Sequence, residues 1–113
     1  MRVITDLVNV SELKEMAACM FGDMVKAVVD IDKDIIALDA ELHSDLEALL
    51  LGKGSKQKDL WGINIYPEVK GDEWVEFDSM INMRPSHGNK SRGVDNEEVR
   101  KKILGVIAKR IKR

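Results

Sequence analysis

Two segments in the middle of the chain, residues 60–66 and 74–83, alternate apolar and polar side chains, and this alternation constrains the fold more than any other feature. Successive side chains of a β-strand point to opposite faces, so each segment is expected to form a half-buried strand. Pro67 ends the first strand because proline has no N–H to donate, and Gly71-Asp72 is typical of a turn. The two segments therefore predict a β-hairpin.

The register of this hairpin follows from placing both apolar rows on one side. One such register sets Ile65 opposite Val75 and Asn64 opposite Glu76. The second face then carries a polar row beside the side-chain-free Gly62: Asn64, Glu76, Asp78 and Asn82. This row could form the floor of a pocket, but polar residues that only solvate one face of an antiparallel sheet are the commoner case.

A second hairpin is predicted at residues 24–42. A two-residue turn at Lys33-Asp34 pairs Ile31 with Ile36 and gathers the apolar side chains of both strands on one face. A three-residue turn would bring Asp39 onto that face, so burial favours the two-residue turn.

Helical spacing of apolar residues predicts helices at residues 11–21, 44–52 and 95–112. We expect Ser11 and Asp95 to cap the first and third of these, and Ser44 with Glu47 to form a capping box at the second.

Residues 2–5 are short and β-branched, which predicts an edge strand. The complete order is then β-α-β-β-α-β-β-α. It predicts an α+β fold: a two-layer sandwich whose mostly antiparallel sheet is built from two hairpins, with about three helices on one side.

The length of 113 residues predicts a single domain spanning residues 1–113. No apolar run is long enough for a membrane helix or a secretory signal, so no membrane partner is expected. The single cysteine, Cys19, cannot form an internal disulfide, and it favours a reducing compartment such as the cytoplasm. Because Cys19 lies in an apolar helical stretch, we expect it in the core.

Charge is distributed unevenly along the chain. Residues 1–50 carry 4 Lys/Arg against 11 Asp/Glu, and residues 51–113 carry 14 against 9, so a net charge of −7 is followed by one of +5. A basic half can attract a nucleic acid or another polyanion. The overall pI near 5.7 nevertheless disfavours a dedicated nucleic-acid binder.

The basic residues of the loop at 84–94, with sequence RPSHGNKSRGV, suggest an anion site. Guanidinium, ammonium, hydroxyl and amide groups are the donors that a phosphate-bearing ligand needs. The candidate ligand-binding residues are Arg84, Ser86, Asn89, Lys90, Ser91 and Arg92. The alternative is that Arg84 and Arg92 fold back onto Glu76 and Asp78 as intrachain ion pairs, and the sequence does not choose between the two.

The two histidines offer weaker signals. Glu41, His43 and Asp45 match no established metal-ligand spacing, so neither a metal nor another cofactor is expected. An acid–base site built from Glu76 or Asp78 with His43 or His87 rests on residue types alone. Glu76, Asp78 and His43 are the catalytic candidates if the protein is an enzyme.

Three phrases of the sequence resemble a known family: GDMVKAVVDI, ELHSDLEALLLGKGSKQKDLWGINIYP and EFDSMINMRPSHGNKSRGV. It is a domain-of-unknown-function family of short prokaryotic proteins, and the resemblance covers nearly the whole chain. It implies no activity, cofactor or catalytic residue, because none is assigned to that family. It also argues against His87 as a catalytic base, because relatives carry glutamine at that position.

Three function classes follow. The leading hypothesis is a small cytoplasmic binding module for an anionic, phosphate-bearing small molecule, held by the loop at 84–94. The second is a hydrolase-like enzyme that uses carboxylates and His43. The third is a protein-interaction module, for example a homodimer that buries the polar face of the second hairpin. Nucleic acid is compatible with the basic half but is not favoured.

Removing divalent metal ions should not unfold the protein, because Glu41, His43 and Asp45 lack the four-ligand closure of a structural zinc site. A thermal melt with and without a chelator tests this. A large drop in melting temperature on adding the chelator would contradict the prediction.

Overall fold

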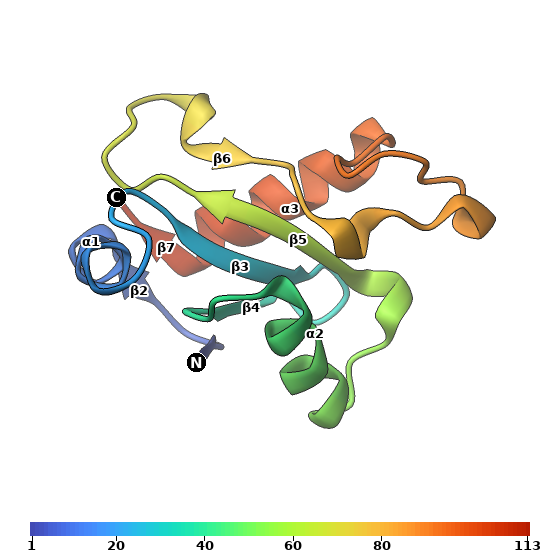
Figure 1. The fold of residues 1–113 in the computed structure, drawn as a ribbon, viewed down its shortest axis with the longest axis horizontal. Helices are drawn as coiled ribbons and strands as arrows, with labels where there is room; N and C mark the ends of the chain where they lie inside the picture. Colours follow the sequence, from blue (N-terminus) through green and yellow to red (C-terminus); the bar gives the residue numbers. More distant parts are fainter.

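Five strands form the central sheet, in the order β1-β4-β3-β5-β6, and every neighbouring pair is antiparallel. The structure is a computed structural model that describes residues 1–113 (Figure 1). The strands are β1 (Arg2–Ile4), β3 (Val25–Asp30), β4 (Ile35–Leu38), β5 (Leu60–Ile65) and β6 (Val75–Glu76). Two further short strands, β2 (Val8–Asn9) and β7 (Ile111–Lys112), pair in parallel and join the two ends of the chain.

Three α-helices pack around the sheet: α1 (Val10–Cys19), α2 (His43–Gly52) and α3 (Glu97–Arg110). Short 3-10 turns lie at η1 (Gln57–Asp59), η2 (Asp72–Trp74), η3 (Met80–Asn82) and η4 (Pro85–His87). The predicted α+β class, with a mostly antiparallel sheet and an edge strand at residues 2–4, is confirmed. None of the helices combines the length and the apolar character that crossing a membrane requires.

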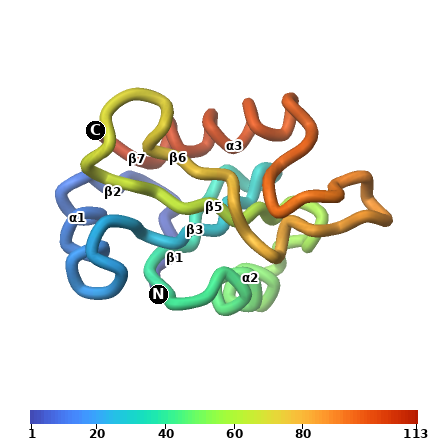
Figure 2. Tube along the Cα trace, turned by 45° about the horizontal axis from the view of Figure 1, so that its top comes forward, coloured from blue at the N-terminus to red at the C-terminus, as the bar shows by residue number.

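The helices do not all lie on one side of the sheet, as the sequence had suggested. Helices α1 and α3 share the larger core with one face, whereas α2 packs Leu46 and Leu50 against Val28, Ala37 and Leu60 on the other. Figure 2 shows α3 and α2 on opposite sides of the sheet. Strand β3 is therefore buried on both faces, which explains why its sequence is almost continuously apolar.

The hairpin of β3 and β4 has the predicted faces but not the predicted turn. Ile36 lies opposite Val29 rather than Ile31, and four residues connect the strands. The Asp30 carboxylate accepts hydrogen bonds from the backbone N–H groups of Asp32 and Lys33, both at 2.9 Å, and this favours the longer turn. A shift of two residues preserves the alternation, so Ile36 is fully buried as expected.

The predicted helix starts are displaced from those in the structure. Asn9, not Ser11, caps α1, and its side chain forms a reciprocal capping box with Glu12. Asn96, not Asp95, caps α3 by accepting from two backbone N–H groups. Cys19, expected in the core, is exposed because it is the last residue of α1.

The second hairpin has the predicted register, with Asn64 opposite Glu76 and Ile65 opposite Val75. Strand β6 nevertheless stops at Glu76 instead of continuing to residue 83. Beyond this point the chain turns across β5, and the Asn82 side chain takes the place of a neighbouring strand. Its Oδ1 accepts from Gly62 N at 2.8 Å, and its Nδ2 donates to Gly62 O at 2.9 Å.

Gly62 is required where this turn crosses β5. A Cβ atom at residue 62 would lie 2.5 Å from Ser79 Cβ, closer than real side chains approach each other. The pocket that the sequence analysis considered beside Gly62 does not form there, because Ser79, which is 1% exposed, fills the space.

Gly62→Ala should destabilise the protein by about 1–3 kcal/mol, because the added methyl group overpacks a filled site. Removing the obstructing side chain as well, in the double variant with Ser79→Gly, should restore part of that loss. Chemical denaturation of both single variants and the double variant measures the coupling.

Gly105→Ala provides the matched control, because a Cβ at this exposed position of α3 meets no atom within 4 Å. Alanine is the better helix former, so the control should gain about 0.5–1 kcal/mol. If Gly62→Ala and Gly105→Ala change the free energy of unfolding equally, the close approach of Ser79 to Gly62 is contradicted.

Candidate functional site

Two buried asparagines hold the segment that follows β6. Asn82 donates a second hydrogen bond from Nδ2 to Arg92 O, at 2.9 Å. Asn89 donates from Nδ2 to Asn82 O at 2.7 Å and to Gly93 O at 2.9 Å, and its Oδ1 accepts from Asp95 N at 2.8 Å. Asn89, a predicted ligand donor, is thus 4% exposed with its amide engaged by the backbone.

Arg84 also has a structural position. Its guanidinium lies 4.8 Å from the centre of the Trp61 ring and donates to Leu60 O and to Ile81 O. The nearest carboxylate is that of Glu47, at 3.9 Å, so Arg84 pairs with neither Glu76 nor Asp78. Burial lowers the pKa of Arg84, and the Glu47 carboxylate opposes this shift.

The outer part of the loop is tied to Asp95. One carboxylate oxygen accepts from Ser91 Oγ at 2.6 Å, and the other accepts from Lys90 N at 2.7 Å. These two hydrogen bonds lower the pKa of Asp95. The side chains of Lys90 and Ser86 are exposed. Three predicted ligand residues, Asn89, Ser91 and Arg84, therefore contribute to the loop's own structure.

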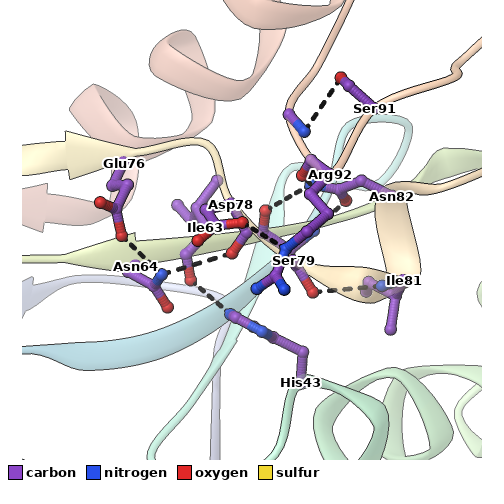
Figure 3. Close-up of polar contacts among 12 residues, drawn as sticks. His43, Ile63, Asn64, Glu76, Asp78, Ser79, Ile81, Asn82, Ser91 and Arg92 are labelled. Carbon is purple, nitrogen blue, oxygen red and sulfur yellow. Dashed lines mark hydrogen bonds and ion pairs between the residues drawn. The ribbon is translucent and has the colours of Figure 1, made fainter.

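Arg92 is placed differently, over the sheet and facing α2. Its Nε donates to Asp78 Oδ1 at 2.7 Å, so the predicted ion pair with Asp78 is present (Figure 3). The two terminal guanidinium nitrogens donate to no protein atom. Both side chains remain about half exposed, at 54% and 42%, which leaves this pair accessible to a ligand.

His43 lies at the start of α2 and points to the same region (Figure 3). The side chain is 8% exposed, and its Nε2 donates to Ile63 O at 2.8 Å, which places the proton of the neutral ring on Nε2. Burial lowers the pKa of His43. The cations Lys26 and Arg92 lower it further, while the Ile63 carbonyl and Asp78 oppose the shift.

These groups surround a cleft of about 160 Å³, which we call the His43 cleft. Its lining consists of Lys26, Leu42, His43, Ser44, Ser79, Met80, Ile81 and Arg92. Helix α2 begins here without a side-chain cap, so the expected Ser44/Glu47 capping box does not form. Asp45 N donates to Leu42 O at 3.2 Å, but the backbone N–H groups of His43 and Ser44, the first two of α2, lack acceptors within the protein.

The catalytic candidates are only partly brought together. Glu76 accepts from Asn64 Nδ2 at 2.9 Å and from the Tyr66 hydroxyl at 3.2 Å. No hydrogen bond joins His43 to Glu76 or to Asp78. Glu41 and Asp45 are exposed, and no three His, Cys, Asp or Glu side chains gather as metal ligands.

Sequence reasoning missed three polar residues of the cleft, Lys26, Ser44 and Ser79. Lys26 carried a signal, because it is the only basic residue within the apolar strand VKAVVD. It is half-buried with no carboxylate partner, and its Nζ lies 5.2 Å from the centre of the Phe21 ring. Ser44 carried no such signal, because its residue type suggested a helix cap.

Comparison with known proteins identifies a family but no activity. A family model described as "Protein of unknown function (DUF5674)" matches residues 2–110. The match confirms the resemblance found in the sequence to a domain-of-unknown-function family. No curated protein and no solved structure matches the chain.

Protein stability should fall as the pH drops below about 6.5, the ordinary pKa of histidine. Because burial lowers the pKa of His43 in the folded state, the unfolded state takes up the proton first. The contribution of His43 is complete above pH 6.5 and is lost as the pH falls through the folded pKa.

His43→Gln keeps an N–H donor for Ile63 O but cannot titrate, so its stability should depend less on pH between about 6.5 and 5 than that of the wild type. Denaturation curves across this range measure the effect. The exposed His87 supplies the control. If His87→Gln reduces the pH dependence of stability as much as His43→Gln does, burial of His43 is not its cause.

Proposed function

The chain belongs to the DUF5674 family, whose description assigns no function, and from the His43 cleft we propose that it binds a small ligand bearing a phosphate or another oxyanion. The observation that carries this proposal is the set of unpaired positive groups around the cleft. They are the Lys26 ammonium, the terminal nitrogens of Arg92 and the uncapped start of α2.

Each of these groups favours negative charge for a separate reason. The start of an α-helix carries a partial positive charge and free N–H donors, and both favour an oxyanion. A guanidinium can donate two parallel hydrogen bonds to a phosphate. Lys26 is half-buried without a carboxylate partner, so an anion in the cleft would stabilise its charge.

The proposed anion site overlaps the sequence hypothesis in one residue. Of the six predicted ligand residues, only Arg92 lines the cleft. The loop at 84–94 contributes mainly by fixing the backbone of Arg92, whose carbonyl accepts from Asn82 Nδ2 and from Ser79 N at 2.9 Å each.

The rim of the cleft indicates what is attached to the anionic group. Leu42 is 55% exposed and Met80 is 64% exposed, and both line the opening. The cleft has room for little more than the oxyanion itself, so the rest of the ligand would lie over these apolar side chains. This favours a ligand that joins an anionic group to an apolar one.

The hydrolase-like alternative has less support. A general base needs its partner within hydrogen-bond distance, and His43 is paired with a backbone carbonyl instead of Glu76 or Asp78.

The single exposed cysteine is compatible with the proposed cytoplasmic location, where thiols remain reduced.

Arg92→Ala should weaken binding of inorganic phosphate about tenfold, because a charge-assisted contact is lost. Stability should change by only about 0–1 kcal/mol, since the ion pair with Asp78 is exposed. Asp78→Asn should have the opposite effect on affinity, because it removes the competing negative charge. Calorimetric titration at two ionic strengths, together with melting curves, measures both quantities.

Lys90→Ala is the matched control: it removes an exposed cation from the same loop and should leave phosphate affinity nearly unchanged. If the wild type binds no phosphate and Arg92→Ala loses stability, Arg92 serves only the ion pair with Asp78, and the proposal is wrong.

A further inference from the structure

A second hollow, of about 300 Å³, lies at the other end of β5 from β6 and shares no residue with the His43 cleft. Four residues line it: Lys58, Trp61, Arg84 and His87. They come from η1, from β5 and from either end of η4, so segments far apart in the sequence meet here. Three of the four can carry positive charge, and none of the four is acidic.

The charges in this hollow are poorly compensated. Lys58 is exposed and forms no ion pair. The Arg84 side chain is 10% exposed, and its hydrogen bonds go to two backbone carbonyls, Leu60 O and Ile81 O. The Glu47 carboxylate stays at 3.9 Å from the guanidinium. Arg84 therefore has one long ion pair, with Glu47, and Lys58 has none, so an anion that enters from solvent would find cationic donors to bind.

Trp61 supplies an independent observation. The residue is 8% exposed, and its indole Nε1 has no hydrogen-bond acceptor in the protein. Buried N–H donors almost always have a partner, so an unpaired one indicates that something else supplies the acceptor. Trp61 lines the hollow, so an oxyanion bound there would supply this acceptor once the indole N–H turns toward it.

We propose that the hollow formed by Lys58, Trp61, Arg84 and His87 is a second oxyanion site, which takes the phosphate group of a small molecule. Arg84 and Lys58 provide the charge, and His87 provides a further donor at the exposed side. This site is independent of the proposed function at the His43 cleft, because the two share no residue.

A small molecule fits this hollow better than a single-stranded nucleic acid does. Proteins bind single strands by stacking bases on exposed aromatic faces. Here Arg84 lies over the Trp61 ring, and almost all of the indole is buried. The ring is therefore a wall of the hollow and offers no face for a base.

The indole N–H resonances provide the test, because the chain has only two tryptophans, Trp61 and Trp74. In a titration of the wild type with inorganic phosphate, followed by ¹H–¹⁵N correlation spectra, the Trp61 signal should move and saturate. Trp74 is the internal reference. Sodium chloride at matched ionic strength should leave both signals in place, and a linear shift of Trp61 that chloride reproduces would overturn the proposal.

Lys58→Ala should weaken the phosphate affinity read at Trp61 about three- to tenfold, because an exposed cation is removed without touching the structural Arg84. Lys53→Ala, which removes an exposed cation that does not line the hollow, is the control. Equal affinities of Lys58→Ala and wild type would also overturn the proposal.

Two further measurements distinguish phosphate binding at this hollow from binding at the His43 cleft and from binding of RNA. Arg92→Ala should leave the Trp61 response unchanged, so failure at one site is distinguishable from failure at the other. A short single-stranded RNA tested in parallel should move the Trp61 signal no more than phosphate does. If RNA moves it and phosphate does not, the small-molecule assignment is wrong.

Discussion

The pair of hydrogen bonds between the Asn82 side chain and the backbone of Gly62 is the interaction on which both proposed sites depend. Strand β6 ends after two residues, so the edge of β5 would otherwise present unpaired N–H and C=O groups. The Asn82 amide has one acceptor and one donor spaced as in a peptide group, and it pairs with Gly62 as a strand would. Since Asn82 is fully buried, losing either bond would leave a backbone group unsatisfied.

This pairing also determines where the charged side chains lie. Asn82 fixes Arg92 through its carbonyl, and Asn89 fixes Asn82 in turn. The acids of the same region are used for structure: Asp95 holds the loop, and Glu76 holds Asn64 and Tyr66. Positive groups around both hollows therefore stay without full compensation, although the chain as a whole carries a net charge of −2.

The alternation of apolar and polar residues predicted which residues form strands and which face of the sheet each one occupies. It did not predict contacts between segments that are far apart in the sequence. The register at Ile65 and Val75 follows from matching apolar rows, and it is correct. The turn between β3 and β4 could not be predicted in the same way. A shift of two residues in the pairing of these strands leaves every side chain on the same face of the sheet, so the apolar pattern fits both turns. The apolar–polar alternation of the sequence also continues through Asn82, which led to the prediction of a strand there. In the structure Asn82 pairs with Gly62 through its side chain and not through its backbone. The approach of His43, Lys26 and Arg92 has no local signature, because it needs α2, β3 and the loop to meet.

Arg84 and Arg92 show why residue type alone could not define the site. Both are arginines of one loop, and nothing in their local sequence separates their roles. Arg84 covers the β5 edge beyond Asn82, where its donors satisfy carbonyls that no strand reaches, so its side chain is 10% exposed. Arg92 has only an exposed pair with Asp78, a kind of contact that contributes about 0–1 kcal/mol. A loosely held guanidinium can exchange its carboxylate partner for a ligand at little cost, whereas Arg84 cannot leave its carbonyls. At the two proposed sites, Arg92 would therefore be free to bind and release an anion, whereas Arg84 would have to bind one without leaving its carbonyls.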